Sequence, residues 1–434
     1  MSKKLHLVSL GCNKNLVDSE VMLGRLRNYE ITDEAEIADV IIVNTCGFIE
    51  AAKQESINTI LSLHEIRKDK SILVMSGCLT ERYQKELQEQ MPEIDIFTGV
   101  GDYEKIDKLI ASKESRFTPE VYLANENSQR VITGSSYHAY IKISEGCNQT
   151  CSFCAIPSFK GKLHSRTLES MKKEVISLMT QGYYDFSFIS QDSSSYGRDI
   201  ELKDGLIDLI DTIEKIDGIK SARILYLYPS TTTNNLIDKI SDSKVFQTYY
   251  DMPIQHISNS MLLRMKRGFG KDKTVDLLER MKNKPNSFVR TSVIAGHPNE
   301  SEEEFKEVCD FMSEFNFDRF NVFEYSNEET TSAFNLEQIE KDIIESRADT
   351  LGDIAQDSTL KSLKNMIGQT IEVVIDGKSD EHEYILSARP LLWAVEIDGD
   401  ILINDTSEKE IFYGKTYNAK ITELAGDRLL ATLI

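Results

Sequence analysis

One ten-residue segment, residues 145–154, constrains this chain more than any other stretch. It contains three cysteines, Cys147, Cys151 and Cys154, in a C-x3-C-x2-C spacing. Three thiolates on one tight loop can bind three irons of a cubane iron–sulfur cluster. The fourth iron would have no protein ligand, and an open metal position is usually where a substrate or cofactor binds. The segment therefore predicts a cluster with a free coordination site.

A zinc loop is the alternative interpretation of the same three cysteines. Structural zinc takes four protein ligands, so this reading requires one more side chain nearby. His138 and His164 flank the segment, and either of them could supply that ligand. The spacing alone leaves both metals open.

The segments after residue 137 alternate between strand-like and helix-like patterns, which predicts a parallel sheet. Strands are expected at 139–144, 185–190, 221–228, 247–254, 289–295 and 319–325, and helices at 168–181, 206–216, 232–240, 272–281 and 302–315. Six such units favour a partial, open (β/α)6 barrel. Active sites of such barrels lie at the carboxyl ends of the strands. The cysteine segment follows the first strand, so it is expected at that end.

Residues 1–100 repeat a simpler unit three times, in which a short apolar strand ends near a cysteine. The strands at 4–10, 40–44 and 71–75 lead to Cys12, Cys46 and Cys78, with helical segments at 18–28 and 47–68. The pattern predicts a doubly wound parallel sheet, where ligands bind beyond the carboxyl ends of the strands. The fold would therefore bring these three cysteines together. Three separate buried thiols are the alternative.

The remaining segments complete an α/β architecture. Residues 101–136 are turn-like, and residues 336–365 have the pattern of one long helix. From residue 366 onward, short strands are expected at 371–375, 391–397, 401–403 and 416–422. Asp376-Gly377 and residues 398–400 are typical hairpin turns, which indicates a small antiparallel β-barrel. The expected domains are 1–120, 137–365 and 366–434.

Composition and charge limit the cellular compartment and the kinds of partner that we expect for this chain. The 434-residue chain has seven cysteines, no apolar run of membrane-spanning length and no signal-peptide pattern at its start, so we expect a cytoplasmic protein that uses cysteine for metal binding or catalysis. The net charge is -21, and residues 366–434 carry 13 acidic against 6 basic side chains. This balance disfavours nucleic acid as the primary partner. It fits a basic protein partner, or simply good solubility.

Several motifs resemble the methylthiotransferase family of radical S-adenosylmethionine enzymes. They lie at residues 9–12, 14–20, 44–49 and 52–56, and continue through 191–192, 226–229, 253–256, 265–267 and 325–326. The C-terminal barrel resembles a TRAM domain. Members that modify tRNA typically have Gln and then Met-Asn after the first cysteine, whereas this chain has Asn13-Lys14-Asn15. The chain is therefore more similar to the branch that methylthiolates an aspartate of a small-subunit ribosomal protein.

The resemblance implies a set of cofactors and ligands. Two 4Fe-4S clusters are expected: a radical-generating one on the three cysteines of residues 147–154, and an auxiliary one on Cys12, Cys46 and Cys78. One S-adenosylmethionine would donate a methyl group to sulfur. Another would be cleaved to a 5′-deoxyadenosyl radical that takes hydrogen from the aspartate β-carbon. The residues expected to contact this cofactor are Phe153, Gln191 and Gln255, and no catalytic side chain is assigned.

The resemblance also implies partners and leaves two alternatives. A basic small-subunit ribosomal protein is the expected substrate, with an external electron donor of flavodoxin or ferredoxin type and a sulfur source. Neither a membrane nor nucleic acid is expected as the primary partner. The alternatives are the same chemistry on a tRNA adenosine, and a non-catalytic iron–sulfur redox or sensor module.

Two departures from the family pattern affect these expectations. Asn13 stands where the family usually has proline, and His297 and Asn299 change a Gly-Phe-Pro-Gly-Glu motif after the fifth barrel strand. The second change puts any cofactor contact there in doubt. The seventh cysteine, Cys309, and the single tryptophan, Trp393, are both expected in the core rather than at a site.

Overall fold

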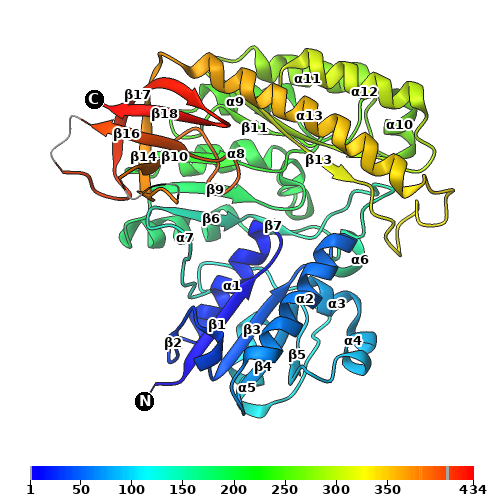
Figure 1. The fold of residues 1–434 in the computed structure, drawn as a ribbon, viewed down its shortest axis with the longest axis vertical. Helices are drawn as coiled ribbons and strands as arrows, with labels where there is room; N and C mark the ends of the chain where they lie inside the picture. Colours follow the sequence, from blue (N-terminus) through cyan, green and yellow to red (C-terminus); the bar gives the residue numbers. More distant parts are fainter. Residues whose placement is uncertain (1, 381, 383, 407–409) are drawn as a thin grey trace.

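The computed structural model describes residues 2–380, 382, 384–406 and 410–434. An N-terminal sheet domain, a barrel of parallel strands and a C-terminal β-barrel follow one another along the chain (Figure 1). Within these residues, no helix has both the length and the apolar character needed to cross a membrane.

The N-terminal domain is a five-stranded parallel sheet in the order β2-β1-β3-β4-β5. Its strands are β1 (Lys4–Ser9), β2 (Glu30–Ile31), β3 (Val40–Thr45), β4 (Ile72–Gly77) and β5 (Ile96–Phe97). Its helices are α1 (Asn13–Arg25), α2 (Glu50–Ile66), α3 (Cys78–Arg82), α4 (Gln84–Gln90) and α5 (Ile106–Ser112). Ile41 and Ile42 are both buried but belong to different apolar clusters, because successive strand residues face opposite sides of the sheet. The sheet is therefore covered on both faces, as predicted.

The helix α5 lies within residues 101–136, where the sequence pattern predicted only a turn-like connector. Ile106, Leu109 and Ile110 are buried, and they follow the i, i+3, i+4 spacing of one helix face. The helix is short and flanked by polar runs, which hid this spacing.

The central domain is a partial barrel of six parallel strands, as predicted. They are β6 (His138–Lys142), β9 (Asp185–Ile189), β10 (Ser221–Ile224), β11 (Tyr249–Asp251), β12 (Phe288–Ala295) and β13 (Arg319–Glu324). They pair as β10-β9-β6 and β11-β12-β13, and a parallel bridge from Ala222 to Phe246 links the two halves. The surrounding helices are α7 (Leu168–Thr180), α8 (Gly205–Ile213), α9 (Asn234–Asp242), α10 (Asn259–Arg264), α11 (Lys271–Lys282), α12 (Glu302–Phe315) and α13 (Lys341–Met366).

The C-terminal domain is a closed barrel in the order β14-β15-β16-β18-β17. Its strands are β14 (Thr370–Lys378), β15 (Leu386–Pro390), β16 (Ile401–Thr406), β17 (Thr416–Ala425) and β18 (Arg428–Leu433). Four of the pairings are antiparallel, as expected, but β16 and β18 pair in parallel, so the barrel is mixed.

Three local predictions in this domain were wrong. Residues 398–400 are not a hairpin turn, because the described residues between β15 and β16 include no strand. Residues 391–397 form turns rather than a strand, because Trp393 there is buried and packs against Phe288 of the central barrel, with ring centroids 6.3 Å apart. Asp376-Gly377 lies inside β14 at a register shift rather than in a hairpin. The Asp376 carboxylate accepts a hydrogen bond from Tyr137 of the neighbouring domain. The last two segments are shaped by contacts between domains, which a local pattern does not contain.

The C-terminal barrel covers the amino ends of the central strands. Arg389 Nη2 donates to Asp185 Oδ2 at 3.0 Å, and the Arg319 guanidinium lies 5.0 Å from the Trp393 ring centroid. Asp185 and Arg319 are the first residues of β9 and β13. The acidic barrel therefore sits at the end of the strands opposite the cysteine segment (Figure 1).

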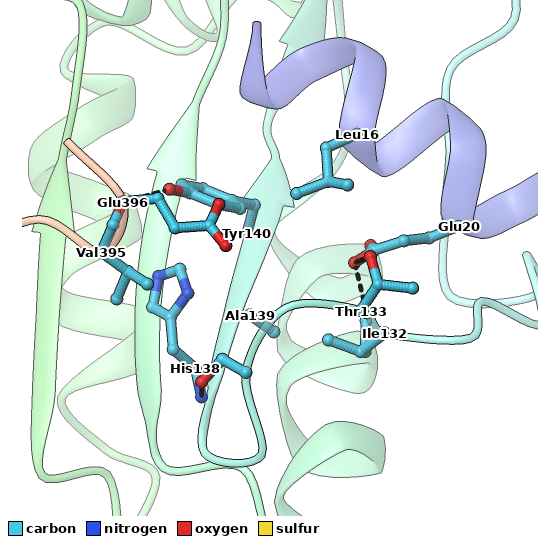
Figure 2. A pocket seen from close by; sticks show the side chains of 10 residues that line it. Leu16, Glu20, Ile132, Thr133, His138, Ala139, Tyr140, Val395 and Glu396 are labelled. Carbon is cyan, nitrogen blue, oxygen red and sulfur yellow. Dashed lines mark hydrogen bonds between the residues drawn. The ribbon is translucent and has the colours of Figure 1, made fainter. Parts of the chain in front are cut away.

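A small cavity marks the junction of the three domains (Figure 2). Its volume is about 10 Å³, which is room for one water molecule at most. Its walls come from α1, the connector, β6 and the turn before β16: Leu16, Glu20, Ile132, Thr133, Ser135, His138, Ala139, Tyr140, Val395 and Glu396. The cavity is a packing junction and cannot hold a cofactor.

His138 in the wall of this junction makes stability depend on pH. Its Nε2 lies 2.9 Å from Ser187 Oγ, and burial lowers the pKa of His138 to about 3. An unfolded histidine has a pKa of about 6.5, so between pH 6.5 and 3 only the unfolded chain takes up this proton. The stabilisation is complete above pH 6.5 and is lost as pH falls, by about 1.4 kcal/mol per pH unit.

We expect the free energy of unfolding to fall by about 2 kcal/mol more between pH 7 and pH 5 in the wild type than in His138→Gln. Urea titrations followed by the fluorescence of Trp393, the single tryptophan, measure this difference. Equal pH slopes in the two proteins would show that His138 titrates normally in the folded chain.

Candidate active site

The three cysteines of the central segment lie on a loop between β7 (Ser144–Glu145) and α6 (Ile156–Lys160), at the carboxyl end of β6. Gly146 starts the loop with φ +77°, and a Cβ there would lie 2.2 Å from Lys162 O. Cys147 N donates to Gly161 O at 3.1 Å. Only glycine fits this close approach without strain, so the loop is folded back tightly on the residues after α6.

The middle of the loop is fixed by contacts with three other segments. Ser152 N donates to Met265 O at 3.1 Å, and Ser152 O accepts from Ala333 N at 2.9 Å. Ser152 Oγ lies 2.9 Å from His297 Nε2, and His297 Nδ1 lies 3.1 Å from Pro298 O. Burial lowers the pKa of His297 to about 4, so its ring is neutral near pH 7 and can donate to one partner and accept from the other. His297, a departure from the family pattern, therefore supports the cysteine loop.

The thiols of the loop are surrounded by hydrogen-bond donors. Gln149 N donates to Cys147 Sγ at 3.4 Å, and Arg267 Nη1 donates to Cys151 Sγ at 3.3 Å. Tyr228 Oη lies 3.4 Å from Cys151 Sγ. Donors aimed at sulfur are among the features that set the properties of iron–sulfur sites. The donor set and its surroundings fit a cluster.

Burial also shapes the chemistry of these thiols. It is the main cause that raises the pKa of both Cys147 and Cys154 to about 12, and the neighbouring thiol of Cys151 contributes to this increase. Buried thiols of this kind stay protonated until a metal displaces the protons.

The zinc interpretation loses one of its two candidate ligands. His138 is buried at the amino end of β6, bound to Ser187, so it lies at the wrong end of the strand. His164 is exposed in β8 (His164–Ser165), paired with Glu145. Across the described ranges, no group of three or more His, Cys, Asp or Glu side chains is arranged to hold a single metal ion.

The other three cysteines follow neighbouring strands of the N-terminal sheet. Cys12 precedes α1 after β1, Cys46 follows β3, and Cys78 begins α3 after β4. Gly11 has φ +84°, and a Cβ there would lie 2.7 Å from Cys46 Sγ, so the Cys12 loop and Cys46 touch. Burial is the main cause that raises the pKa of Cys46 to about 11 and that of Cys78 to about 12, and neighbouring thiols of this group contribute to both increases. The sheet thus gathers the three thiols at one edge, at the carboxyl ends of its strands.

A buried contact connects the segments that carry the two cysteine groups. Helix α3, which starts at Cys78, packs against α6, which follows Cys154 (Figure 1). Cys78, Ala155 and Phe159 belong to one buried apolar cluster. A buried contact therefore sets the spacing between the two groups.

A buried ionic network also spans this boundary. Lys142 Nζ lies 2.5 Å from Asp18 Oδ1 and 2.7 Å from Glu145 Oε2. Lys160 Nζ lies 3.6 Å from both carboxylates. Burial opposes ionisation of Glu145, but the two lysines outweigh it and hold the pKa of Glu145 at about 2. Asp18 belongs to α1, so the network ties the N-terminal domain to the barrel directly behind the cysteine loop.

The three predicted cofactor contacts all lie at the carboxyl end of the barrel. Phe153 packs against the apolar cluster of Met261, Met265, Ile294, Tyr325 and Ala333. Gln191 follows β9 and donates through Nε2 to Glu145, while its buried Oε1 has no hydrogen-bond partner among the residues that the structure describes. Gln255 follows β11 with φ +70°, and its buried Oε1 is also without a partner. Two unpartnered acceptors beside an apolar surface fit a ligand with an amine and a flat ring.

The sequence analysis did not single out Arg267, Tyr228 or the network of Asp18, Lys142, Glu145 and Lys160. A partial signal was present, because Arg267, Tyr228 and Asp18 lie in the motifs that carried the family resemblance. Their roles depend on side-chain contacts between segments far apart in the chain, which no spacing reveals.

Comparison with known proteins agrees with this arrangement. Residues 4–99 match the uncharacterized protein family UPF0004, residues 141–312 match the radical SAM superfamily, and residues 367–434 match the TRAM domain. Among solved structures, the chain is similar to a radical S-adenosylmethionine methyltransferase from Kitasatospora setae, with a TM-score of 0.54 at 14% identity over 77% of this chain and 74% of that one. A similarity at this level shows the fold alone.

Curated relatives are far more similar. The ribosomal protein uS12 methylthiotransferase RimO of Sulfurovum sp. is 73% identical over 100% of this chain and 98% of that protein. The proteins of the same name from Aliarcobacter butzleri and Sulfurimonas denitrificans are 63% and 62% identical over 100% of this chain, and 98% and 99% of theirs. The chain therefore belongs to the RimO family of radical S-adenosylmethionine methylthiotransferases, enzymes that use S-adenosylmethionine and a 4Fe-4S cluster.

Proposed function

We propose that this enzyme adds a methylthio group to the β-carbon of an aspartate in ribosomal protein uS12, and that it uses two 4Fe-4S clusters to do so. One observation carries the proposal. Each of the two parallel-strand domains has three cysteines beyond the carboxyl ends of its strands, and a buried contact connects the segments that carry them. The curated relatives that match over the whole chain are named as uS12 methylthiotransferases. The three domains proposed for this work are residues 1–120, 137–365 and 366–434.

Cys147, Cys151 and Cys154 would hold the radical-generating cluster, and Cys12, Cys46 and Cys78 the auxiliary one. When bound, these groups and S-adenosylmethionine supply a 5′-deoxyadenosyl radical for hydrogen abstraction, and a methylated sulfur for the resulting carbon centre. An unactivated C–H bond requires such a radical. The protein's part is to bind, orient and shield these groups.

The side chains around the first cysteine group divide this work. Phe153 offers an apolar face for the adenine, and the unpartnered oxygens of Gln191 and Gln255 can accept from the amine of the cofactor. Arg267 directs a hydrogen-bond donor at Cys151 Sγ, and the Tyr228 hydroxyl lies 3.4 Å from the same sulfur. The contact of α3 with α6 keeps the second cysteine group close, so that a substrate carbon can meet sulfur without release.

Partners follow from the chemistry. Reductive cleavage needs an external electron donor, for which a flavodoxin or ferredoxin is suited, and each turnover consumes a sulfur atom that a separate source must replace. We propose that the reaction takes place in the cytoplasm.

A basic protein substrate fits the net charge of -21 on this chain. The acidic C-terminal barrel lies away from the cysteines, so contacts with the reacting aspartate must come from the N-terminal domain and the barrel mouth.

A direct assay tests the proposal. The protein, reconstituted anaerobically with iron and sulfide, is incubated with reductant, S-adenosylmethionine and uS12, and the substrate is analysed by mass spectrometry. We expect a methylthio group on one aspartate of uS12 and none on tRNA offered in parallel. Methylthiolated tRNA with unmodified uS12 would instead identify a tRNA-modifying enzyme. Cofactor cleavage with neither product would overturn the substrate assignment.

A further inference from the structure

Lys14 is a buried cation that reaches from the auxiliary cysteine group into the mouth of the barrel. It lies in α1, two residues after Cys12, and its relative exposure is 9%. Its Nζ is 3.5 Å from Ser190 O, at the carboxyl end of β9, and 3.5 Å from the centroid of the Tyr226 ring, which follows β10. The ammonium group therefore lies on the barrel side of the boundary, near Cys12 and near Glu145, which is two residues before Cys147.

Within the described residues, Lys14 has no carboxylate within 4.0 Å, although it is buried. Glu145, an acidic residue in its vicinity, is already paired with Lys142 at 2.7 Å. Asp251, the other one, accepts from Arg290 Nη1 at 3.0 Å and from Tyr226 N at 3.0 Å. A buried charge without a counter-ion is costly, and an aromatic ring offsets only part of this cost. The charged groups near Lys14 are thus the Cys12 thiol and two carboxylates that already have partners, so no carboxylate is paired with this ammonium group.

The aromatic partner of Lys14 is held in an unusual conformation. Tyr226 has φ +64°, a backbone region that bulky residues rarely adopt. Such strain persists only where the surrounding structure imposes it, and it is commonest at ligand sites. Here the Asp251 carboxylate fixes the Tyr226 N–H, so the ring is kept under the ammonium group.

We propose that Lys14 binds the carboxylate of the substrate aspartate. This inference rests on the proposed function and deepens it. In that reaction the β-carbon is bonded directly to the carboxylate carbon, so a cation that holds the carboxylate also holds the reacting carbon between the two cysteine groups. The carboxylate forms the ion pair that Lys14 lacks, and the ammonium group offsets the repulsion between this carboxylate and the nearby thiolates. Lys14 thereby selects aspartate over neutral side chains.

A double-substitution experiment tests the inference without turnover. Binding of fluorescently labelled uS12 to the reconstituted holoenzyme is measured anaerobically by anisotropy, with no reductant present. The substrate is either native uS12 or a variant whose target aspartate is replaced by asparagine. For the wild-type enzyme, we expect asparagine to weaken binding about 10- to 100-fold, the size of a hydrogen bond to a charged group. For Lys14→Met, native and asparagine substrates should bind equally well.

Three further variants keep the result interpretable. Lys306→Met, on the outside of the barrel with 74% of the side chain exposed, should retain the full preference for aspartate. Lys14→Arg keeps the charge and can stack on Tyr226, so it should retain a preference as well. Lys14→Gln takes the place of Lys14→Met if the methionine variant loses iron.

Two results would overturn the inference. A full preference for aspartate in Lys14→Met or Lys14→Gln would show that Lys14 does not recognise the carboxylate. Weaker binding of S-adenosylmethionine, with the aspartate preference intact, would assign Lys14 to the carboxylate of the cofactor instead. If wild-type enzyme neither binds nor modifies uS12, the proposed function itself fails, and that result is distinct from the other two.

Discussion

Replacement of Cys147, Cys151 and Cys154 by alanine is expected to abolish reductive cleavage of S-adenosylmethionine, and with it all methylthiolation. The three thiols lie on one loop fixed at both ends and in the middle, with donors directed at two of the sulfurs. The seventh cysteine, Cys309, cannot replace them, because it packs on α12 against the barrel core. The measurement is the yield of 5′-deoxyadenosine after addition of reductant.

The matched variant replaces Cys12, Cys46 and Cys78 by alanine. It should still produce 5′-deoxyadenosine, because the loop that carries Cys147, Cys151 and Cys154 is built entirely within the central domain. It should form no methylthiolated product. Iron content separates the two sites: about eight irons per chain in the wild type should fall to about four in either triple variant. Loss of all iron in one variant would show that the two sites are not independent. About four irons per chain in the wild type would contradict the assignment of two clusters.

Glu328→Gln is expected to uncouple cofactor cleavage from product formation. The Glu328 carboxylate, 1% exposed, lies 2.9 Å from Arg82 Nη1 and 3.2 Å from Lys53 Nζ. Arg82 closes α3, which begins at Cys78, and also donates to Gly47 O beside Cys46 at 2.6 Å. Glu328 thus holds the loops that carry Cys46 and Cys78 against the segment after β13. Through Ala333, that segment also binds Ser152 of the loop that carries Cys147, Cys151 and Cys154.

Loss of this carboxylate leaves two cations at the boundary without a buried counter-charge. Removal of one partner from a buried ion pair typically costs about 3–5 kcal/mol, and misplacement of a reacting group by about 1 Å can cost about 100-fold in rate. We expect the yield of methylthiolated uS12 to fall about 10- to 100-fold, while 5′-deoxyadenosine continues to form. The ratio of the two products, measured in one reaction, reports the uncoupling.

The chain offers a closely matched control for this prediction. Glu50 pairs with the same Lys53 at 2.7 Å, but its side chain is 74% exposed. An exposed pair contributes only about 0–1 kcal/mol, so Glu50→Gln should leave the product ratio unchanged. An unchanged ratio in Glu328→Gln as well would show that Glu328 has no part in setting the distance between the cysteine groups.

The sequence by itself determined the cysteines, the three kinds of fold and the family. Cysteine spacing is a local property of the sequence. The alternation of strand and helix indicates where the carboxyl ends of parallel strands lie, so the sequence alone could place Cys12, Cys46 and Cys78 together. The family resemblance, rather than this reasoning, named Gln191 and Gln255 as cofactor contacts, and both follow barrel strands. Reasoning from local patterns failed at residues 391–397, because an apolar run does not reveal whether it pairs in a sheet or packs as a turn.

Only the tertiary structure decided what lies between the two cysteine groups. Lys14, Arg267 and Glu328 are each unremarkable as charged residues in a chain that is 28% charged. Their chemistry comes from burial and from partners more than 100 residues away, such as Ser190 for Lys14 and Arg82 for Glu328. A charge matters here because of what surrounds it and whether a counter-charge is within reach, and both are set by the packing of domains rather than by local sequence.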